Sequence, residues 1–147
     1  MTERILVVDD EPANVELLKA FLEDVADDIR GVTNPKDVEK LVTEFEPDLV
    51  LLDLHMPGVD GLTLLRRLGK LRDDAGYLPV IVLTADIDKA VRDAALELKA
   101  DDFLLKPLDR REVRIRVRNL LQTRHLFKQL THATGFFPRI YRAGDSA

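Results

Sequence analysis

The sequence predicts an α/β fold in which helices cover both faces of a parallel sheet. Short apolar runs of three to five residues alternate five times with segments whose apolar residues recur at helical spacing. The runs are continuously apolar instead of alternating with polar residues, as expected for strands that are buried on both faces. A regular succession of strand and helix of this kind is typical of a doubly wound parallel sheet.

The first two strand–helix units occupy the N-terminal third of the chain. The run Ile5 to Val8 predicts a buried strand, and Pro12 suits the first turn of the next helix because its missing N–H costs little there. A second strand is expected at residues 29–32, and Asn34-Pro35 is typical of a cap and first turn. The apolar residues that mark the two helices are Val15, Leu17, Leu18, Phe21, Leu22 and Val25, then Val38, Leu41, Val42 and Phe45.

The other three units follow the same pattern. Their strands are expected at Leu49 to Leu52, Pro79 to Leu83 and Phe103 to Leu105. Turn-forming residues between Pro57 and Gly61 predict a loop, and Asp73 to Gly76 is expected to be a polar connection. The last helix should begin near Asp109 and run past Leu120. Apolar stripes mark the intervening helices: Leu62, Leu64, Leu65, Leu68 and Leu71, then Ala90, Val91, Ala94, Ala95 and Leu98.

Polar residues follow the apolar runs at the point where each predicted strand ends. Right-handed crossovers favour the flavodoxin-like (βα)5 fold, with strand order 2-1-3-4-5. The carboxyl ends of parallel strands lie at one edge of the sheet, where such folds bind ligands. The residues expected there are Asp9, Asp10, Asp53, Thr84 and Lys106. Each alone is an ordinary turn or cap residue, but their occurrence in order at four strand ends predicts a site.

Three carboxylates at one edge require a compensating cation. At about 4 Å, each pair repels by roughly 4 kcal/mol at an effective dielectric constant near 20. Oxygen ligands without His or Cys favour Mg²⁺, with Mn²⁺ as an alternative. A carboxylate such as Asp53 can accept a phosphoryl group covalently, and Lys106 and the Thr84 hydroxyl could then contact its oxygens.

Composition and charge exclude several classes of protein. The chain has no cysteine, which excludes disulfides and thiolate chemistry. Residues 1–105 contain 12 basic and 24 acidic residues, whereas residues 106–147 contain 10 basic and three acidic residues. The basic end lacks an aromatic series, so direct nucleic-acid binding is not expected. No run is long enough to span a membrane and the start lacks a signal peptide, so a cytoplasmic location is expected.

Four segments of the chain resemble the receiver domains of two-component response regulators. The resemblance extends from Arg4 to about Gln122, and the loop Asp-Leu-x-Met-Pro-x-x-Asp-Gly that begins at Asp53 is its most specific element. The matching segments are Ile5-Leu6-Val7-Val8-Asp9-Asp10-Glu11, Asp53-Leu54-His55-Met56-Pro57-Gly58-Val59-Asp60-Gly61, Val82-Leu83-Thr84-Ala85 and Asp102-Phe103-Leu104-Leu105-Lys106-Pro107.

The resemblance implies that Asp53 is phosphorylated by a histidine kinase or a phosphotransfer protein. The implied ligands of Mg²⁺ are Asp9, which would act mostly through metal-bound water, Asp10, Asp53 and the backbone carbonyl of His55. Thr84 and Lys106 would contact the phosphoryl oxygens, and Lys106-Pro107 would be a cis peptide bond. A protein of this kind is regulatory, and it catalyses only its own phosphorylation and dephosphorylation.

The resemblance also implies a conformational switch. Thr84 would move toward the phosphoryl group, and Phe103 would enter the space it leaves. The surface of the fourth helix, fifth strand and fifth helix would then change and could form a homodimer. The basic residues expected on it are Arg110, Arg111, Arg114, Arg116 and Arg118.

The C-terminal part of the chain is longer than a receiver requires. We expect a receiver domain at residues 3–122, followed at 123–147 by a helical extension and a flexible tail. The apolar spacing from Val113 to Leu130 stays helical, although Leu126 falls outside that stripe, and the extended helix could form a dimer. Residues 117–124 resemble receivers that precede cyclic-di-GMP turnover modules.

Two other functions fit part of the sequence. A docking adaptor that works without phosphorylation has no need of the combination Asp53, Thr84 and Lys106. A phosphohydrolase with an aspartyl nucleophile typically carries a second Asp two residues later, where this chain has His55. The receiver function therefore explains more of the residues than either alternative.

Overall fold

The computed structural model describes residues 3–56, 59–85 and 89–134 and has a central sheet of five parallel strands. The sheet strands are β1 (Arg4–Val8), β2 (Asp28–Val32), β3 (Leu49–Asp53), β6 (Val80–Thr84) and β7 (Asp102–Leu105). The helices are α1 (Pro12–Leu22), α2 (Val38–Phe45), α3 (Gly61–Ala75), α4 (Lys89–Glu97) and α5 (Arg110–Thr134). The spatial order β2-β1-β3-β6-β7 is the flavodoxin-like order predicted from the sequence.

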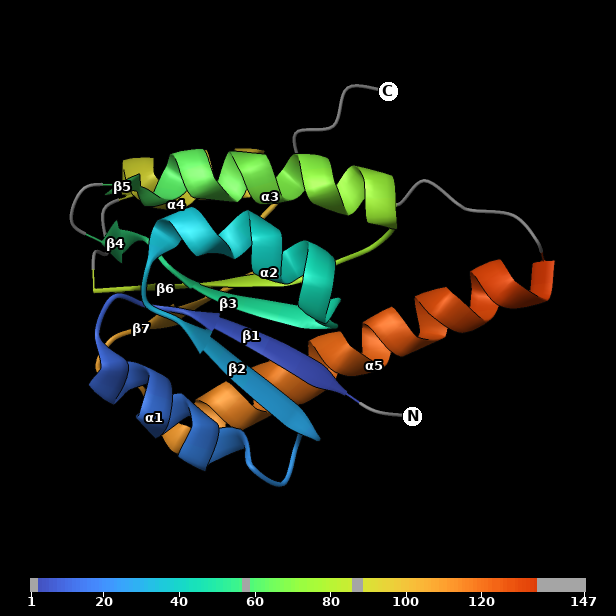
Figure 1. Ribbon diagram of the computed structural model, residues 1–147, viewed down its shortest axis with the longest axis horizontal. Coiled ribbons are helices and arrows are strands. Elements are labelled where there is room, and N and C mark those ends of the chain that lie inside the picture. The colour runs from blue at the N-terminus through green and yellow to red at the C-terminus, as the bar shows by residue number, and fades with distance from the viewer. Residues whose placement is uncertain (1–2, 57–58, 86–88, 135–147) are drawn as a thin grey trace.

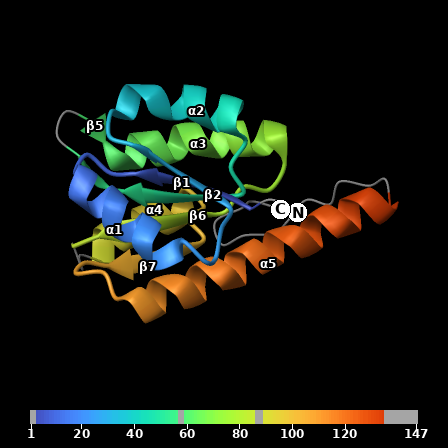
Figure 2. The same ribbon diagram turned by 60° about the horizontal axis from the view of Figure 1, so that its bottom comes forward.

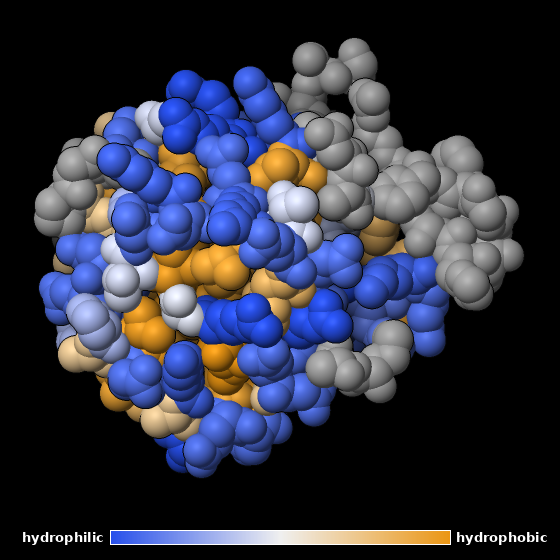
Figure 3. Space-filling model, in the orientation of Figure 1, coloured by the Kyte–Doolittle hydropathy of each residue, from blue (hydrophilic) through white to orange (hydrophobic). Residues whose placement is uncertain are grey.

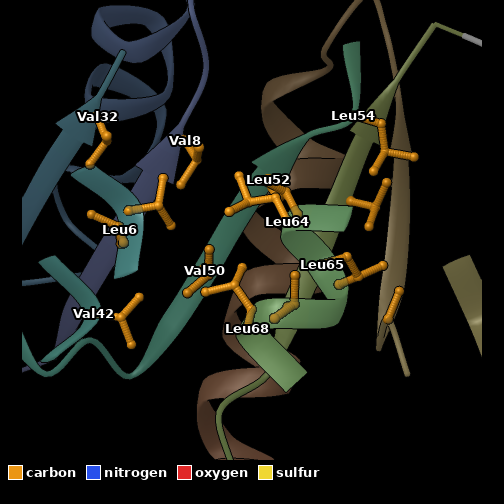
Figure 4. Packing of buried hydrophobic residues seen from close by; sticks show 14 of the residues in the cluster. Leu6, Val8, Val32, Val42, Val50, Leu52, Leu54, Leu64, Leu65 and Leu68 are labelled. Atoms are coloured by element: carbon orange, nitrogen blue, oxygen red, sulfur yellow. The ribbon is translucent and has the colours of Figure 1, made fainter. Parts of the chain in front are cut away.

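The sheet lies between two layers of helices, as Figures 1 and 2 show. Helices α1 and α5 cover one face, and α2, α3 and α4 cover the other. Every residue of β3 and β6 is buried, which explains why these runs are apolar throughout. Apolar side chains of β1, β3 and α3 point toward one another in the larger core, including Leu6, Leu52 and Leu65 (Figure 4).

The face of the molecule seen in Figure 3 is mostly hydrophilic. Figure 3 shows charged and polar residues over most of the face seen in Figure 1, with small hydrophobic patches between them. The sheet is therefore held by two buried cores and its helices present their polar sides to solvent.

Two predicted connections differ in the structure. The polar connection expected at Asp73 to Gly76 is wrong for its first part, because α3 continues to Ala75. Charged residues are acceptable in a helix, and the helix ends only where Gly76 takes a positive φ of 96°. In the loop expected between residues 57 and 61, β4 (His55–Met56) pairs with β5 (Val59–Asp60), and residues 57–58 lie outside the described part.

Side-chain caps mark the start of the 3-10 turn that precedes α2 and the start of α3. Asn34 caps a 3-10 turn, η1 (Pro35–Asp37), by accepting a hydrogen bond from the Lys36 N–H at 3.1 Å, and α2 follows. Asp60 caps α3 in the same way through the Leu62 N–H, also at 3.1 Å. At Gly61 a Cβ atom would lie 2.4 Å from the Leu54 carbonyl oxygen, so α3 can start this close to β3 only with glycine.

Helix α5 crosses residues 122 and 123 without a break and extends past the body (Figure 1). Arg124 and Phe127 still contact the body, whereas Leu126 and Leu130 are 55% and 51% exposed. The exposure of Leu126 agrees with the sequence pattern, but that of Leu130 does not, because the body no longer reaches it. The predicted tail after Thr134 lies outside the described residues. No described helix is long and apolar enough to cross a membrane.

Candidate functional site

The residues predicted to form a site lie together at the carboxyl edge of the sheet. Asp9 follows β1, Asp53 ends β3, Thr84 ends β6 and Lys106 follows β7. The parallel register brings these ends together, because Val8 pairs with Leu52 and Asp53 pairs with Leu83. Asp9, Asp53 and Thr84 are all buried, with 0%, 1% and 1% of their surface exposed. Buried polar side chains at one sheet edge point to a built site.

Asp9 is held in one orientation by its neighbours. Its Oδ1 accepts a hydrogen bond from the Glu11 N–H at 3.0 Å, and its Oδ2 accepts one from Asn14 Nδ2 at 3.1 Å. The same Oδ2 lies 3.6 Å from Lys106 Nζ. The first turn of α1 thus fixes the carboxylate, and Asn14 is a contributor that the sequence analysis did not identify.

The Asp53 carboxylate lies between a backbone donor and a lysine. Its Oδ1 accepts a hydrogen bond from the His55 N–H at 3.0 Å, and its Oδ2 lies 3.2 Å from Lys106 Nζ. Burial raises the pKa of Asp53, and the nearby Asp9 carboxylate adds to this, although the His55 N–H and Lys106 oppose it. Burial and Asp9 together outweigh the His55 N–H and Lys106, so the charged form of Asp53 is less favourable here than in water.

Lys106 faces both carboxylates. Burial disfavours its charge, but Asp53 and Asp9 outweigh that effect and raise the pKa of the ammonium group. Its peptide bond to Pro107 is cis, as the family resemblance implied. Lys106 is consequently a permanent positive charge at the site at neutral pH.

Three carboxylates converge closely enough to share a cation. One oxygen atom from each of Asp9, Asp10 and Asp53 lies within 4.8 Å of the others. All donors are oxygen atoms, which are the ligands that Mg²⁺ prefers, and three converging carboxylates attract a cation. The donor set therefore fits Mg²⁺ better than a metal that prefers nitrogen or sulfur.

The His55 side chain makes a contact that the sequence analysis did not predict. The ring atom Nε2 lies 3.1 Å from Thr84 Oγ1. His55 and Thr84 are 29 residues apart and end up side by side because β3 and β6 are paired. A residue two positions after a strand carries no local signal for the direction of its side chain, so this contact could not be predicted.

A hollow extends from Thr84 to the outer side of β7. Its lining comes from β6, α4, β7 and α5: Thr84, Arg92, Asp102, Phe103, Leu105, Glu112 and Arg116. Phe103 is half-buried, and the Arg92 guanidinium lies 5.5 Å from the centre of its ring. Arg116 donates hydrogen bonds to both carboxylate oxygens of Asp102 at 3.0 and 2.8 Å. The hollow connects the site to a surface formed by α4, β7 and α5.

From the sequence, the arginines of α5 are expected to lie on one surface. In the structure they point to different sides of the helix. Arg116 points to β7, whereas Arg114 forms an ion pair with Asp24 after α1. The hydrogen bonds from Arg114 lower the pKa of Asp24 to about 2. Helical spacing explains the difference, because residues two apart on a helix point in different directions. Among these arginines, Arg116 belongs to the α4–β7–α5 surface.

This combination of fold and site defines a receiver-type signalling domain, and comparison with known proteins identifies the family. The family model of the response regulator receiver domain matches residues 5–118. The chain therefore belongs to the response-regulator receiver family of two-component systems. Members of this family are regulatory, and receiver domains interact with histidine kinases or phosphotransfer proteins.

The curated relatives carry different outputs. The chain is 39% identical over 121 residues to the transcriptional regulatory protein BaeR of Escherichia coli O6:H1, covering 82% of this chain and 49% of that protein. It is 40% identical to AruR of Pseudomonas aeruginosa, with 83% and 50% covered. It is 39% identical to the cyclic di-GMP phosphodiesterase response regulator RpfG of Xanthomonas campestris, with 82% and 32% covered. The chain thus spans half or less of these relatives, and RpfG matches the predicted likeness to cyclic-di-GMP regulators.

Solved structures agree with this assignment. A response regulator from Chloroflexus aurantiacus superposes with a TM-score of 0.73 at 30% identity, covering 83% of this chain and 99% of that one. The receiver domain of an HD domain-containing protein from Pseudomonas fluorescens gives 0.78 at 26% identity, with 87% and 93% covered. The sequence prediction of the receiver fold is therefore confirmed.

Proposed function

We propose that this protein takes a phosphoryl group onto Asp53 from the phosphohistidine of a histidine kinase or phosphotransfer protein. The observation that supports this most directly is the buried Asp53 carboxylate, which lies 3.2 Å from Lys106 Nζ and shares a cluster with Asp9 and Asp10. A carboxylate placed beside a lysine and a cation site is suited to accept a phosphoryl group, because the charge of that group is compensated on arrival.

The proposed transfer conserves bonds and charge. A carboxylate oxygen of Asp53 attacks phosphorus, a P–O bond forms, and the P–N bond to the donor histidine breaks. The departing imidazole nitrogen keeps the electron pair of that bond. Water later attacks the phosphorus, the bond to Asp53 breaks, and the carboxylate and inorganic phosphate are released. These two steps are the only reactions that the protein itself would catalyse.

Each neighbour of Asp53 has a proposed role. The residues that would hold Mg²⁺, or Mn²⁺ as an alternative, are Asp9, Asp10, Asp53 and the backbone carbonyl of His55. When bound, the cation offsets negative charge on the phosphoryl oxygens. The Lys106 ammonium group would contact one of these oxygens, and the Thr84 hydroxyl would donate a hydrogen bond to another.

The proposed readout is a change of the α4–β7–α5 surface. Thr84 and Phe103 line one hollow, so a movement of Thr84 toward Asp53 would give the Phe103 ring room to turn inward. The surface could then bind an output module or a second copy of the chain, and the exposed side of α5 at Leu126 and Leu130 offers another route to a dimer. We propose residues 3–122 as the receiver and 123–147 as an extension.

Phosphorylation can be tested by mass spectrometry after incubation with acetyl phosphate and Mg²⁺. The native chain should gain about 80 Da, the mass of one phosphoryl group. Asp53→Asn, which keeps the shape of the side chain, should gain nothing, and EDTA should abolish the gain in the native chain. An equal gain in Asp53→Asn would contradict the proposal.

Dimer formation can be tested by sedimentation with and without beryllofluoride, a phosphoryl mimic. A chain that stays monomeric in both conditions would exclude the proposed dimer.

A further inference from the structure

His55 contacts two residues of the candidate site, Asp53 and Thr84. Its backbone N–H donates to Asp53 Oδ1 at 3.0 Å, and its side-chain Nε2 lies 3.1 Å from Thr84 Oγ1. The backbone of His55 is thus held at the phosphoacceptor while its ring reaches the end of a neighbouring strand. The imidazole is exposed, whereas Thr84 has only 1% of its surface exposed, so the ring stands on the solvent side of the hydroxyl.

We propose that the His55 imidazole is a positioning residue that holds the Thr84 hydroxyl in the resting state and opposes its use by the phosphoryl group. A threonine hydroxyl has one proton to donate, and phosphoryl oxygens on an aspartyl phosphate are acceptors at neutral pH. We assign the ring proton to Nδ1, so that Nε2 accepts a hydrogen bond from the Thr84 hydroxyl. The hydroxyl must then give up His55 before it can donate to a phosphoryl oxygen.

This inference rests on the proposed function of Asp53. It implies that binding of a phosphoryl group must break the His55–Thr84 hydrogen bond, which lowers the affinity of the site for that group. One hydrogen bond typically changes an equilibrium by about two- to tenfold, because solvent replaces part of what is lost. The exposed imidazole can bond to water once Thr84 has left, so the effect should fall within this range. A chain without a hydrogen-bonding ring at residue 55 should bind a phosphoryl group more readily.

A double-mutant cycle separates this role from a merely steric one. Beryllofluoride affinity is measured by ¹⁹F NMR in the presence of Mg²⁺ for the native chain, His55→Phe, Thr84→Val and the double variant. His55→Phe should bind about two- to tenfold tighter than the native chain. The same change should have no effect when Thr84 is already Val, because the hydrogen bond is absent in both proteins.

Three further measurements complete the test. His55→Gln keeps a hydrogen-bonding group at the end of the side chain and should stay within about twofold of native. His125→Phe makes the same substitution on α5, away from the carboxyl edge, and should leave the affinity unchanged. The ¹⁵N shifts of the His55 ring should show an unprotonated Nε2 in the resting protein.

Several results would overturn the proposal. These are an unchanged or weaker affinity in His55→Phe, an equal gain in the Thr84→Val background, and a protonated Nε2. Failure of the native chain to bind beryllofluoride would instead contradict the proposed phosphoacceptor function. Native binding without coupling between residues 55 and 84 would leave that function standing and remove this inference alone.

Discussion

Arg124 and Asp48 are 76 residues apart and form an ion pair at the edge of the sheet opposite Asp53, with 2.5 Å between Nη1 and Oδ1. Arg124 also donates through Nε to the Tyr77 carbonyl oxygen at 3.1 Å. The Tyr77 ring packs edge-on against Phe127 with 5.6 Å between ring centres. These contacts attach the part of α5 beyond residue 122 to the body.

Removal of this attachment should destabilise the protein. The Arg124 and Asp48 side chains are only 17% and 11% exposed, so Arg124→Ala leaves a nearly buried carboxylate without its ion-pair partner. The Arg4 N–H, at 2.7 Å from Oδ2, then remains as a hydrogen-bond donor to Asp48. We expect a loss of about 1–3 kcal/mol in the free energy of unfolding. Arg118→Ala is a suitable control, because Arg118 is 56% exposed and 3.9 Å from Asp24, and it should cost less than about 0.5 kcal/mol. Urea denaturation measures the free energy of unfolding of both variants. Equal losses in Arg124→Ala and Arg118→Ala would contradict the expectation.

Asp53 should lower stability at neutral pH when no divalent cation is present. Burial raises its pKa in the folded state. A carboxyl group with a raised folded pKa contributes stability below its unfolded pKa, near 3.8, and that contribution is lost as the pH rises through the folded pKa. In EDTA at pH 7, Asp53→Asn should therefore be more stable than the native chain by on the order of 1 kcal/mol.

The pH dependence and the effect of Mg²⁺ check this expectation. The advantage of Asp53→Asn should shrink toward pH 4, where the native carboxyl becomes protonated. Adding Mg²⁺ should raise the melting temperature of the native chain more than that of the variant, because a ligand stabilises only the state that binds it. A variant that is less stable than the native chain in EDTA would show that Lys106 already compensates the charge.

Gly61 should be required for the close contact between α3 and the loop after β3. In Gly61→Ala, the new Cβ would approach the Leu54 backbone to 2.4–2.8 Å, and backbone atoms cannot turn away as a side chain can. We expect a loss of about 1–3 kcal/mol in stability. Gly69→Ala, in the middle of the same helix, should instead stabilise by up to about 1 kcal/mol. Thermal unfolding of the two variants compares them directly.

Much of the fold could be predicted because local pattern and burial agree. The continuous apolar runs of β3 and β6 are buried on both sides, and strict alternation with helices left few possible topologies. The end of α3 could not be placed in the same way. Charged residues near a helix end are compatible with a last turn or with a loop, and only the backbone at Gly76 decides between them.

The candidate site was predictable to the extent that strand ends determine it. Asp9 and Lys106 directly follow their strands, and Asp53 and Thr84 are the last residues of theirs, so the parallel sheet brings the four together. Contacts made by side chains that leave the strand ends have no such signal. The ring of His55 on Thr84 and the hydrogen bond from Asn14 to Asp9 depend on side-chain directions that only tertiary packing sets.

The positive charge of Lys106 should weaken the binding of Mg²⁺, which it repels. The same charge should strengthen the binding of a phosphoryl group, which it attracts. Its Nζ lies 3.2 Å from Asp53 and 3.6 Å from Asp9, the same carboxylates that are proposed to hold Mg²⁺. Lys106→Met should bind Mg²⁺ about tenfold more tightly, as expected for removal of a nearby positive charge in a partly screened site. The same variant should bind beryllofluoride more weakly. Calorimetric titration with Mg²⁺ measures the first effect, with Lys40→Met on α2 as a control that should match the native chain. An Mg²⁺ affinity that stays equal or falls in Lys106→Met would show that the cation does not share these carboxylates with the lysine.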